Sequence, residues 1–150
     1  MKFTVNGERR LDMFLGEFSH SLDDKGRLTL PAKFREALAS GVVVTKGIDA
    51  CLTVYPRSVW DPLAENIAGL PVKQRNARRH FFQSATDSIP DRQGRVLIPQ
   101  VLRDYAGLDG EATIIGLYDR VEVWNPDRLA ETKAQEDPEL VAEQLNDFGI

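Results

Sequence analysis

The chain contains the stretch DDKGRLTLPAKFR at residues 23–35 and a second copy of it, DRQGRVLIPQVLR, at residues 91–103. The two copies share an aspartate, a glycine, an arginine, a proline and a final arginine at matching positions. Apolar residues also alternate before each proline. A repeated unit of this size has difficulty burying its apolar face alone, and an internal duplication commonly supplies the partner it needs. We therefore expect two halves that face each other and share one core.

Each copy begins with residues that favour a tight turn. In the first copy, Asp23 can accept a hydrogen bond from the backbone two residues on, and Gly26 can take the positive φ that a tight turn needs. The alternating stretch 14–22 and residues 27–30 are then predicted to form a hairpin around this turn. In the second copy, Asp91 and Gly94 stand at the same positions, so the second half is expected to repeat the order of the first.

The remaining elements follow from periodicity and from the residues that begin or end helices. Ser58 and Asp137 are expected to cap two of the helices, and the last helix carries its apolar residues on one stripe. Strands are predicted at residues 42–45, 52–55, 82–88, 95–98, 112–116 and 120–124, and helices at 32–39, 59–68, 72–83, 99–106, 126–134 and 138–148. The domain organisation predicted is a loosely held extension (1–13), a first repeat (14–60), a helical linker (61–81), a second repeat (82–126) and acidic terminal helices (127–150).

Composition limits the functions that the chain can have. With 150 residues there is room for one sizeable domain. No stretch has the length of a membrane span or the pattern of a signal peptide, so a cytoplasmic protein is expected, without a membrane partner. Cys51 is the only cysteine and is expected to be a buried thiol. His20 and His80 lack metal-ligand spacing, so we expect no metal. We also expect no cofactor and no small-molecule substrate.

Charge is distributed unevenly along the chain. The net charge is −4, which argues against a general nucleic-acid binder. Residues 71–105, however, hold seven Lys and Arg against three acids, whereas residues 106–150 hold eleven acids against three bases. A small cationic face can therefore coexist with an acidic bulk. The arginine-rich run 75–80 is either a solvated helix face or a subunit contact for the acidic tail.

The duplicated turn suits the presentation of two arginines to duplex DNA. Arg27 and Arg95 could bind phosphates or guanine edges, and Lys25 and Arg92 would add point-charge attraction. In the alternative interpretation, Asp23 pairs with Arg27, and Asp91 with Arg95, merely to hold each turn; such exposed pairs contribute less than about 1 kcal/mol. The arginines on the two following helices, Arg35 and Arg103, are predicted to be structural and to bind strand carbonyls or an acid of the motif.

These motifs resemble those of the MraZ family of bacterial transcriptional regulators, whose chains carry two SpoVT-AbrB-like domains. The resemblance covers roughly residues 13–148 and is carried by Asp24–Arg35, by Gln93–Pro99 and by the run FFQSA at residues 81–85. It implies a mainly β, α+β fold of two intertwined AbrB-like (swapped-hairpin) repeats in a pseudo-twofold barrel. It also implies a ring-like homo-oligomer, associated with the nucleoid, that binds promoter repeats of division and cell-wall genes through Arg27 and Arg95. Gln93 replaces the Lys25 of the first copy, so the two turns are not expected to bind alike.

Three other classes remain to be distinguished. An AbrB-type antitoxin would bind DNA through one domain copy and carry a partner-binding tail, and the internal duplication counts against it. An enzyme is disfavoured because the sequence shows no Ser-His-Asp, Cys-His or metal set and no distinctive pair of carboxylates. A purely structural ring would use its acidic helices to bind another protein, and nuclease-insensitive recovery of one stoichiometric partner would identify it.

Overall fold

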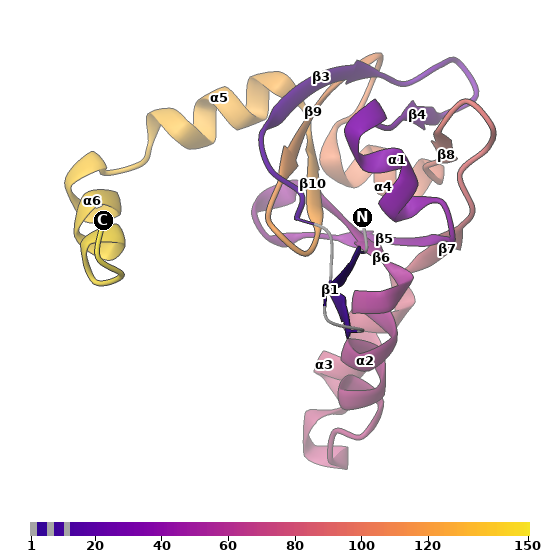
Figure 1. Ribbon diagram of the computed structural model, residues 1–150, viewed down its shortest axis with the longest axis horizontal. Coiled ribbons are helices and arrows are strands. Elements are labelled where there is room, and N and C mark those ends of the chain that lie inside the picture. Colours follow the sequence, from indigo (N-terminus) through magenta and orange to yellow (C-terminus); the bar gives the residue numbers. More distant parts are fainter. Residues whose placement is uncertain (1–2, 6–7, 11–12) are drawn as a thin grey trace.

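The computed structural model of the chain describes residues 3–5, 8–10 and 13–150 and has an α+β fold around a six-stranded antiparallel sheet (Figure 1). The sheet order is β3-β9-β10-β6-β5-β7, so neighbours in space come from both halves of the sequence. Its strands are β3 (Glu17–Ser21), β5 (Val42–Lys46), β6 (Leu52–Pro56), β7 (Thr86–Ser88), β9 (Glu111–Gly116) and β10 (Val121–Trp124). A 3₁₀ turn, η1 (Ile48–Ala50), connects β5 to β6.

The two halves exchange their edge strands. β3 from the first half pairs with β9 from the second, with Phe18 opposite Ile114, and β7 from the second half pairs with β5 from the first, with Val43 opposite Asp87. At the centre of the sheet, β6 and β10 join the halves, with Val54 opposite Val121. The duplication therefore produces one shared sheet, and the two halves share one core as predicted.

The strands that follow the two turns pair with each other. β4 (Arg27–Thr29) and β8 (Arg95–Leu97) form an antiparallel two-stranded ribbon in which Leu28 lies opposite Val96. The predicted hairpin between residues 14–22 and 27–30 is therefore wrong. The chain does reverse at the turn, but β4 pairs with β8, and only an isolated bridge joins Leu22 to Leu28. Pairing across the repeats places Leu28 and Val96 side by side in the core, where both are completely buried.

A short helix follows each ribbon strand, as predicted for residues 32–39 and 99–106. Helices α1 (Ala32–Leu38) and α4 (Gln100–Ala106) start directly after Pro31 and Pro99. Phe34 and Leu102 face inward from these helices and join one core with the ribbon and the sheet. Truncating a core side chain of this kind to alanine typically costs about 2–5 kcal/mol. The fully buried members of this core include Leu28, Leu30, Leu38, Val96, Ile98, Leu102, Ile114 and Val121.

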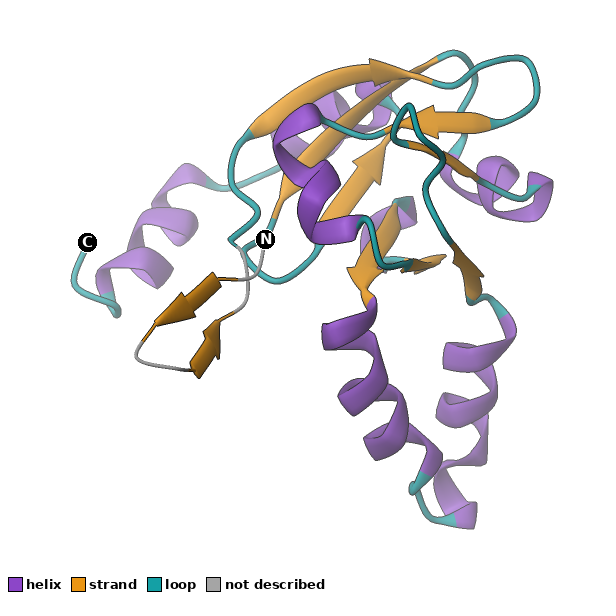
Figure 2. Cartoon of the chain, turned by 45° about the vertical axis from the view of Figure 1, so that its right-hand side comes forward, coloured by secondary structure: helices purple, strands orange, loops and turns teal. Residues whose placement is uncertain are grey.

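Between the repeats, a helical hairpin projects from the sheet (Figure 2). It consists of α2 (Arg57–Ala68), a 3₁₀ turn η2 (Val72–Gln74) and α3 (Arg75–Gln83). Trp60 fixes the two helices together, because Phe81 stacks on it with ring centroids 4.8 Å apart and Phe82 meets it edge-on at 6.2 Å.

Two expectations for this region are wrong. Phe82 belongs to α3 and not to a strand from residue 82: its ring meets both Trp60 and Phe81 edge-on, and only Thr86–Ser88 forms the strand. Ser58 does not cap α2. The helix already includes Ser58, because it begins at Arg57, directly after Pro56. The Ser58 hydroxyl is buried, and no described residue bonds to it.

The chain ends in two helices that form an arm (Figure 1). In α5 (Pro126–Ala134), the Asn125 side chain caps the first turn and Leu129 is buried beside Trp124. α6 (Pro138–Asn146) is capped by Asp137 as predicted. No helix in the described ranges is long and apolar enough to cross a membrane. Of the predicted extension, β1 (Phe3–Val5) and β2 (Glu8–Arg10) pair with each other, whereas residues 1–2, 6–7 and 11–12 lie outside the described ranges.

Candidate nucleic-acid interface

The two turns have the same hydrogen bonds. In the first, the carboxylate of Asp23 accepts from the backbone N–H groups of Lys25 (3.0 Å) and Arg27 (2.9 Å). In the second, the carboxylate of Asp91 accepts from those of Gln93 (2.9 Å) and Arg95 (2.9 Å). Each aspartate therefore satisfies two backbone donors and fixes the point at which the following strand begins.

Each arginine side chain is held by the aspartate of its own turn. Nε of Arg27 lies 2.7 Å from Oδ2 of Asp23, and Nε of Arg95 lies 2.8 Å from Oδ2 of Asp91. A longer contact of 3.8 Å joins Nη1 of Arg95 to Asp23 and links the two turns. The pairing expected in the alternative interpretation is therefore present. In each pair, however, the aspartate binds Nε of the arginine. Within the described ranges, no acceptor binds the terminal nitrogens of Arg27.

The carboxylates remain ionised at neutral pH. The backbone N–H of Arg27 is the main cause that lowers the pKa of Asp23, and the Arg27 side chain lowers it further. Asp91 has a lowered pKa for the same reasons, with Arg95 as the donor. Each pair is half-exposed and contributes little stability, but it fixes the direction of the guanidinium group.

Both glycines of the motif are buried and have a positive φ, +80° at Gly26 and +74° at Gly94. Each is covered by the helix arginine of the other repeat: a Cβ atom at Gly26 would lie 2.7 Å from Cζ of Arg103, and one at Gly94 would overlap Arg35. Nε of Arg35 donates to the carbonyl of Leu30 (3.1 Å), and Nε of Arg103 donates to that of Ile98 (2.9 Å). The prediction that these helix arginines bind strand carbonyls is confirmed.

The outer face of the β4–β8 ribbon displays both turn arginines. Because side chains alternate along a strand, the face opposite Leu28 and Val96 carries Arg27, Thr29, Arg95 and Leu97. Arg27 lies opposite Leu97 and Thr29 opposite Arg95, so the two arginines are related by an approximate twofold axis. A two-stranded ribbon of this kind fits the major groove of duplex DNA. Lys25 and Arg92 are exposed within the two turns that flank it.

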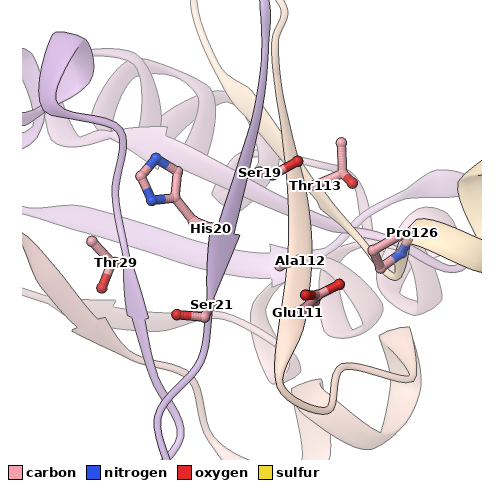
Figure 3. A pocket seen from close by; sticks show the side chains of 8 residues that line it. All are labelled: Ser19, His20, Ser21, Thr29, Glu111, Ala112, Thr113 and Pro126. Atoms are coloured by element: carbon pink, nitrogen blue, oxygen red, sulfur yellow. The ribbon is translucent and has the colours of Figure 1, made fainter.

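Three other groups are excluded as the centre of a chemical site. The Cys51 thiol is buried, and burial is the main cause that raises its pKa to about 12, so it is a core thiol. Burial, with Arg35 as a second cause, lowers the pKa of His20. A hollow of about 470 Å³ lies beside His20, but Figure 3 shows His20 and Thr29 on one side of β3 and β9, and Glu111 and Thr113 on the other. Its lining side chains do not converge on one point.

The exchanged edge strands and the paired strands β4 and β8 define a duplicated α+β protein that displays both turn arginines on one face of the ribbon. The chain belongs to the MraZ family: the family model described as "MraZ protein, putative antitoxin-like" matches twice, at residues 13–80 and 81–144. The resemblance inferred from the motifs is therefore confirmed.

Relatives of similar length carry the name "Transcriptional regulator MraZ". That of Roseiflexus castenholzii is 50% identical over 119 residues, which are 77% of this chain and 83% of the relative. That of Thermomicrobium roseum is 48% identical over 134 residues, 85% of this chain and 94% of the relative. That of Moorella thermoacetica is 45% identical over 143 residues, 92% of this chain and all of the relative. These matches support a transcriptional regulator.

Sequence reasoning missed the cross-repeat packing of Arg35 on Gly94 and of Arg103 on Gly26. The prediction was that these arginines bind strand carbonyls or an acid of the motif, and nothing in the sequence indicated which glycine each arginine covers. One sequence feature could have indicated this packing: both copies contain the glycine and the final arginine at the same spacing. If the two halves face each other, the arginine of each copy can then pack on the glycine of the other.

Proposed function

We propose that the chain is a sequence-specific DNA-binding transcriptional regulator, in the cytoplasm and at the nucleoid, that reads DNA through Arg27 and Arg95. The observation that carries the proposal is the antiparallel β4–β8 ribbon, which brings both arginines to one face. Each aspartate holds Nε of its arginine. The terminal nitrogens of Arg27 can then bind a phosphate or a guanine edge, whereas in Arg95 Nη1 also lies 3.8 Å from Asp23 and Nη2 meets no acid within the described ranges. Lys25 and Arg92 add salt-dependent attraction to the backbone.

We further propose that the chain acts as a ring-like homo-oligomer on promoter repeats of division and cell-wall genes. The charge distribution supports an oligomer, because a net charge of −4 makes one subunit a weak ligand for DNA. Several linked subunits engage several DNA repeats at once, and linkage raises avidity by about 10²–10⁴-fold without any new contact. The choice of target genes rests on membership of the MraZ family.

Fluorescence anisotropy tests this function. The protein is titrated into labelled duplex from its own upstream region and into a scrambled duplex across a salt series. The wild type should prefer the upstream duplex, and Arg27→Ala should abolish this preference while oligomer size is unchanged. Arg57→Ala, which removes the same charge from a partly exposed position at the start of α2, is the matched control and should bind like the wild type. Equal affinity for both duplexes would favour a structural oligomer instead.

A further inference from the structure

Helix α6 has an apolar stripe on which nothing is packed within the described part of the chain. Every residue from 133 to 150 is exposed. Leu140, Val141 and Leu145 are 49%, 39% and 45% exposed, and Phe148, just beyond the helix, is 86% exposed. Contiguous exposed apolar side chains of this kind mark a surface that binds a partner.

A groove of matching character lies between the α2–α3 hairpin and the end of the sheet. It has a volume of about 510 Å³. Ile67, Ala77 and Phe81 line it from the hairpin, and Ile48, Tyr55 and Leu117 line it from the sheet side. Ile48 is 82% exposed and Leu117 is 43% exposed, so the rim of the groove is apolar as well.

Charge favours this pairing. Residues 135–150 hold five acids and no base, whereas residues 72–84, which contain η2 and α3, hold four Lys and Arg and no acid. The acids Glu139 and Glu143 of α6 and Asp147 at its C-cap recur every four residues, on the side away from Val141 and Leu145. They therefore remain in contact with solvent when the stripe is covered. Opposite charges on two segments draw them together over about a Debye length and disfavour the wrong partners.

The helix and the groove of one chain are held apart. α5 is anchored to the domain by buried Leu129, by the hydrogen bond from Arg128 to the Tyr105 carbonyl (2.9 Å) and by the ion pair of Lys133 with Glu17 (3.1 Å). Both views of the molecule show α6 beyond this anchor and away from the α2–α3 hairpin (Figures 1 and 2). The groove is therefore available to a tail from another copy.

We propose that α6 of one copy docks, by its apolar stripe, in the α2–α3 groove of a second copy. The contact joins two different surfaces and is head-to-tail, so its repetition closes a ring when the rotation per subunit allows it. This inference rests on the oligomer part of the proposed function and names the surfaces that form it. The β4–β8 ribbon lies on another side of the molecule, so docking leaves the DNA-binding face uncovered (Figure 1).

Complementation between two variants tests the contact by native mass spectrometry without DNA. The tail variant carries Val141→Asp and Leu145→Asp, and the groove variant carries Ala77→Trp, which fills the groove from an exposed helix position. For each variant alone, the protein concentration required for assembly should rise at least tenfold. An equimolar mixture should form a one-to-one heterodimer, because one intact tail then meets one intact groove. Ala142→Asp, which adds charge to α6 outside the stripe, is the matched control and should assemble like the wild type.

Other outcomes would overturn the proposal. It fails if either variant assembles like the wild type, if the mixture forms no heterodimer, or if the wild type is a monomer. Circular dichroism and thermal melting of each variant verify that the domain remains folded, which is expected since α6 buries no residue. Arg27→Ala should assemble normally. If Arg27→Ala keeps the wild-type preference for the promoter while complementation is intact, the result contradicts the proposed DNA recognition and not this contact.

Discussion

The guanidinium group of Arg103 lies over Gly26 of the other repeat, so close that a Cβ atom on the glycine would come within 2.7 Å of Cζ. The same relationship joins Arg35 to Gly94. The spacing repeated in each copy therefore serves both turns: the glycine allows its own turn, and the arginine of the other repeat closes over that glycine.

Gly26→Ala should destabilise the fold for two reasons that a control can separate. The positive φ alone costs a residue with a Cβ about 1–2 kcal/mol, and the added methyl group also displaces Arg103. Gly110 has the same φ, +81°, but nothing lies within 4 Å of its would-be Cβ. In urea unfolding, Gly26→Ala should therefore lose more free energy of unfolding than Gly110→Ala. Equal losses would contradict the packing role of Arg103.

The two turns should contribute unequally to DNA binding. Lys25 adds a positive charge to the first turn, where the second has the neutral Gln93. Lys25→Gln should reduce the slope of log affinity against log salt by about 1, whereas Gln93→Lys should raise it by a similar amount. Anisotropy titrations at several salt concentrations measure both slopes. If Lys25→Gln leaves the slope unchanged, Lys25 does not contact phosphate.

Acid should destabilise the protein through the turn aspartates. The pKa values of Asp23 and Asp91 lie below their usual value of 3.8 in the folded chain. The ionised carboxylates therefore stabilise the folded state above that pH, and this contribution is lost as pH falls through the lowered folded-state pKa. The double variant Asp23→Asn, Asp91→Asn should show a shallower fall in melting temperature below pH 4 than the wild type. Asp24→Asn, at a neighbouring exposed position, should retain the wild-type steepness.

The Cys51 thiol should be unreactive in the folded protein. Burial raises its pKa to about 12, so almost no thiolate is present at neutral pH and reagents have no access to it. Ellman's reagent should label none of it within minutes at pH 7.5 and all of it in guanidinium chloride. Rapid labelling of the native protein would show that the contacts of Cys51 with Trp124 and Leu129 open readily.

The local features of the fold were predictable from the sequence, but which strands pair with each other was not. Proline before α1 and α4, and Asp137 before α6, indicated where these helices begin because those signals act within one turn. The hairpin prediction failed since β3 finds its partner in β9, far away in sequence, and local alternation carries no information about that choice. For the candidate interface, the duplication predicted both turns, whereas the reciprocal packing of Arg103 on Gly26 emerged only from the three-dimensional arrangement.

Covalent fusion of the two repeats has a consequence for evolution. A dimer of single-repeat chains must present two identical turns, so any substitution in one turn appears in both. Here the β4–β8 ribbon joins two turns encoded separately, and they already differ at Lys25 and Gln93 and at Asp24 and Arg92. Under the proposed function, each turn is therefore free to adapt to its own half of a DNA site while the shared core stays constant, and a nearly symmetric protein can bind an asymmetric operator.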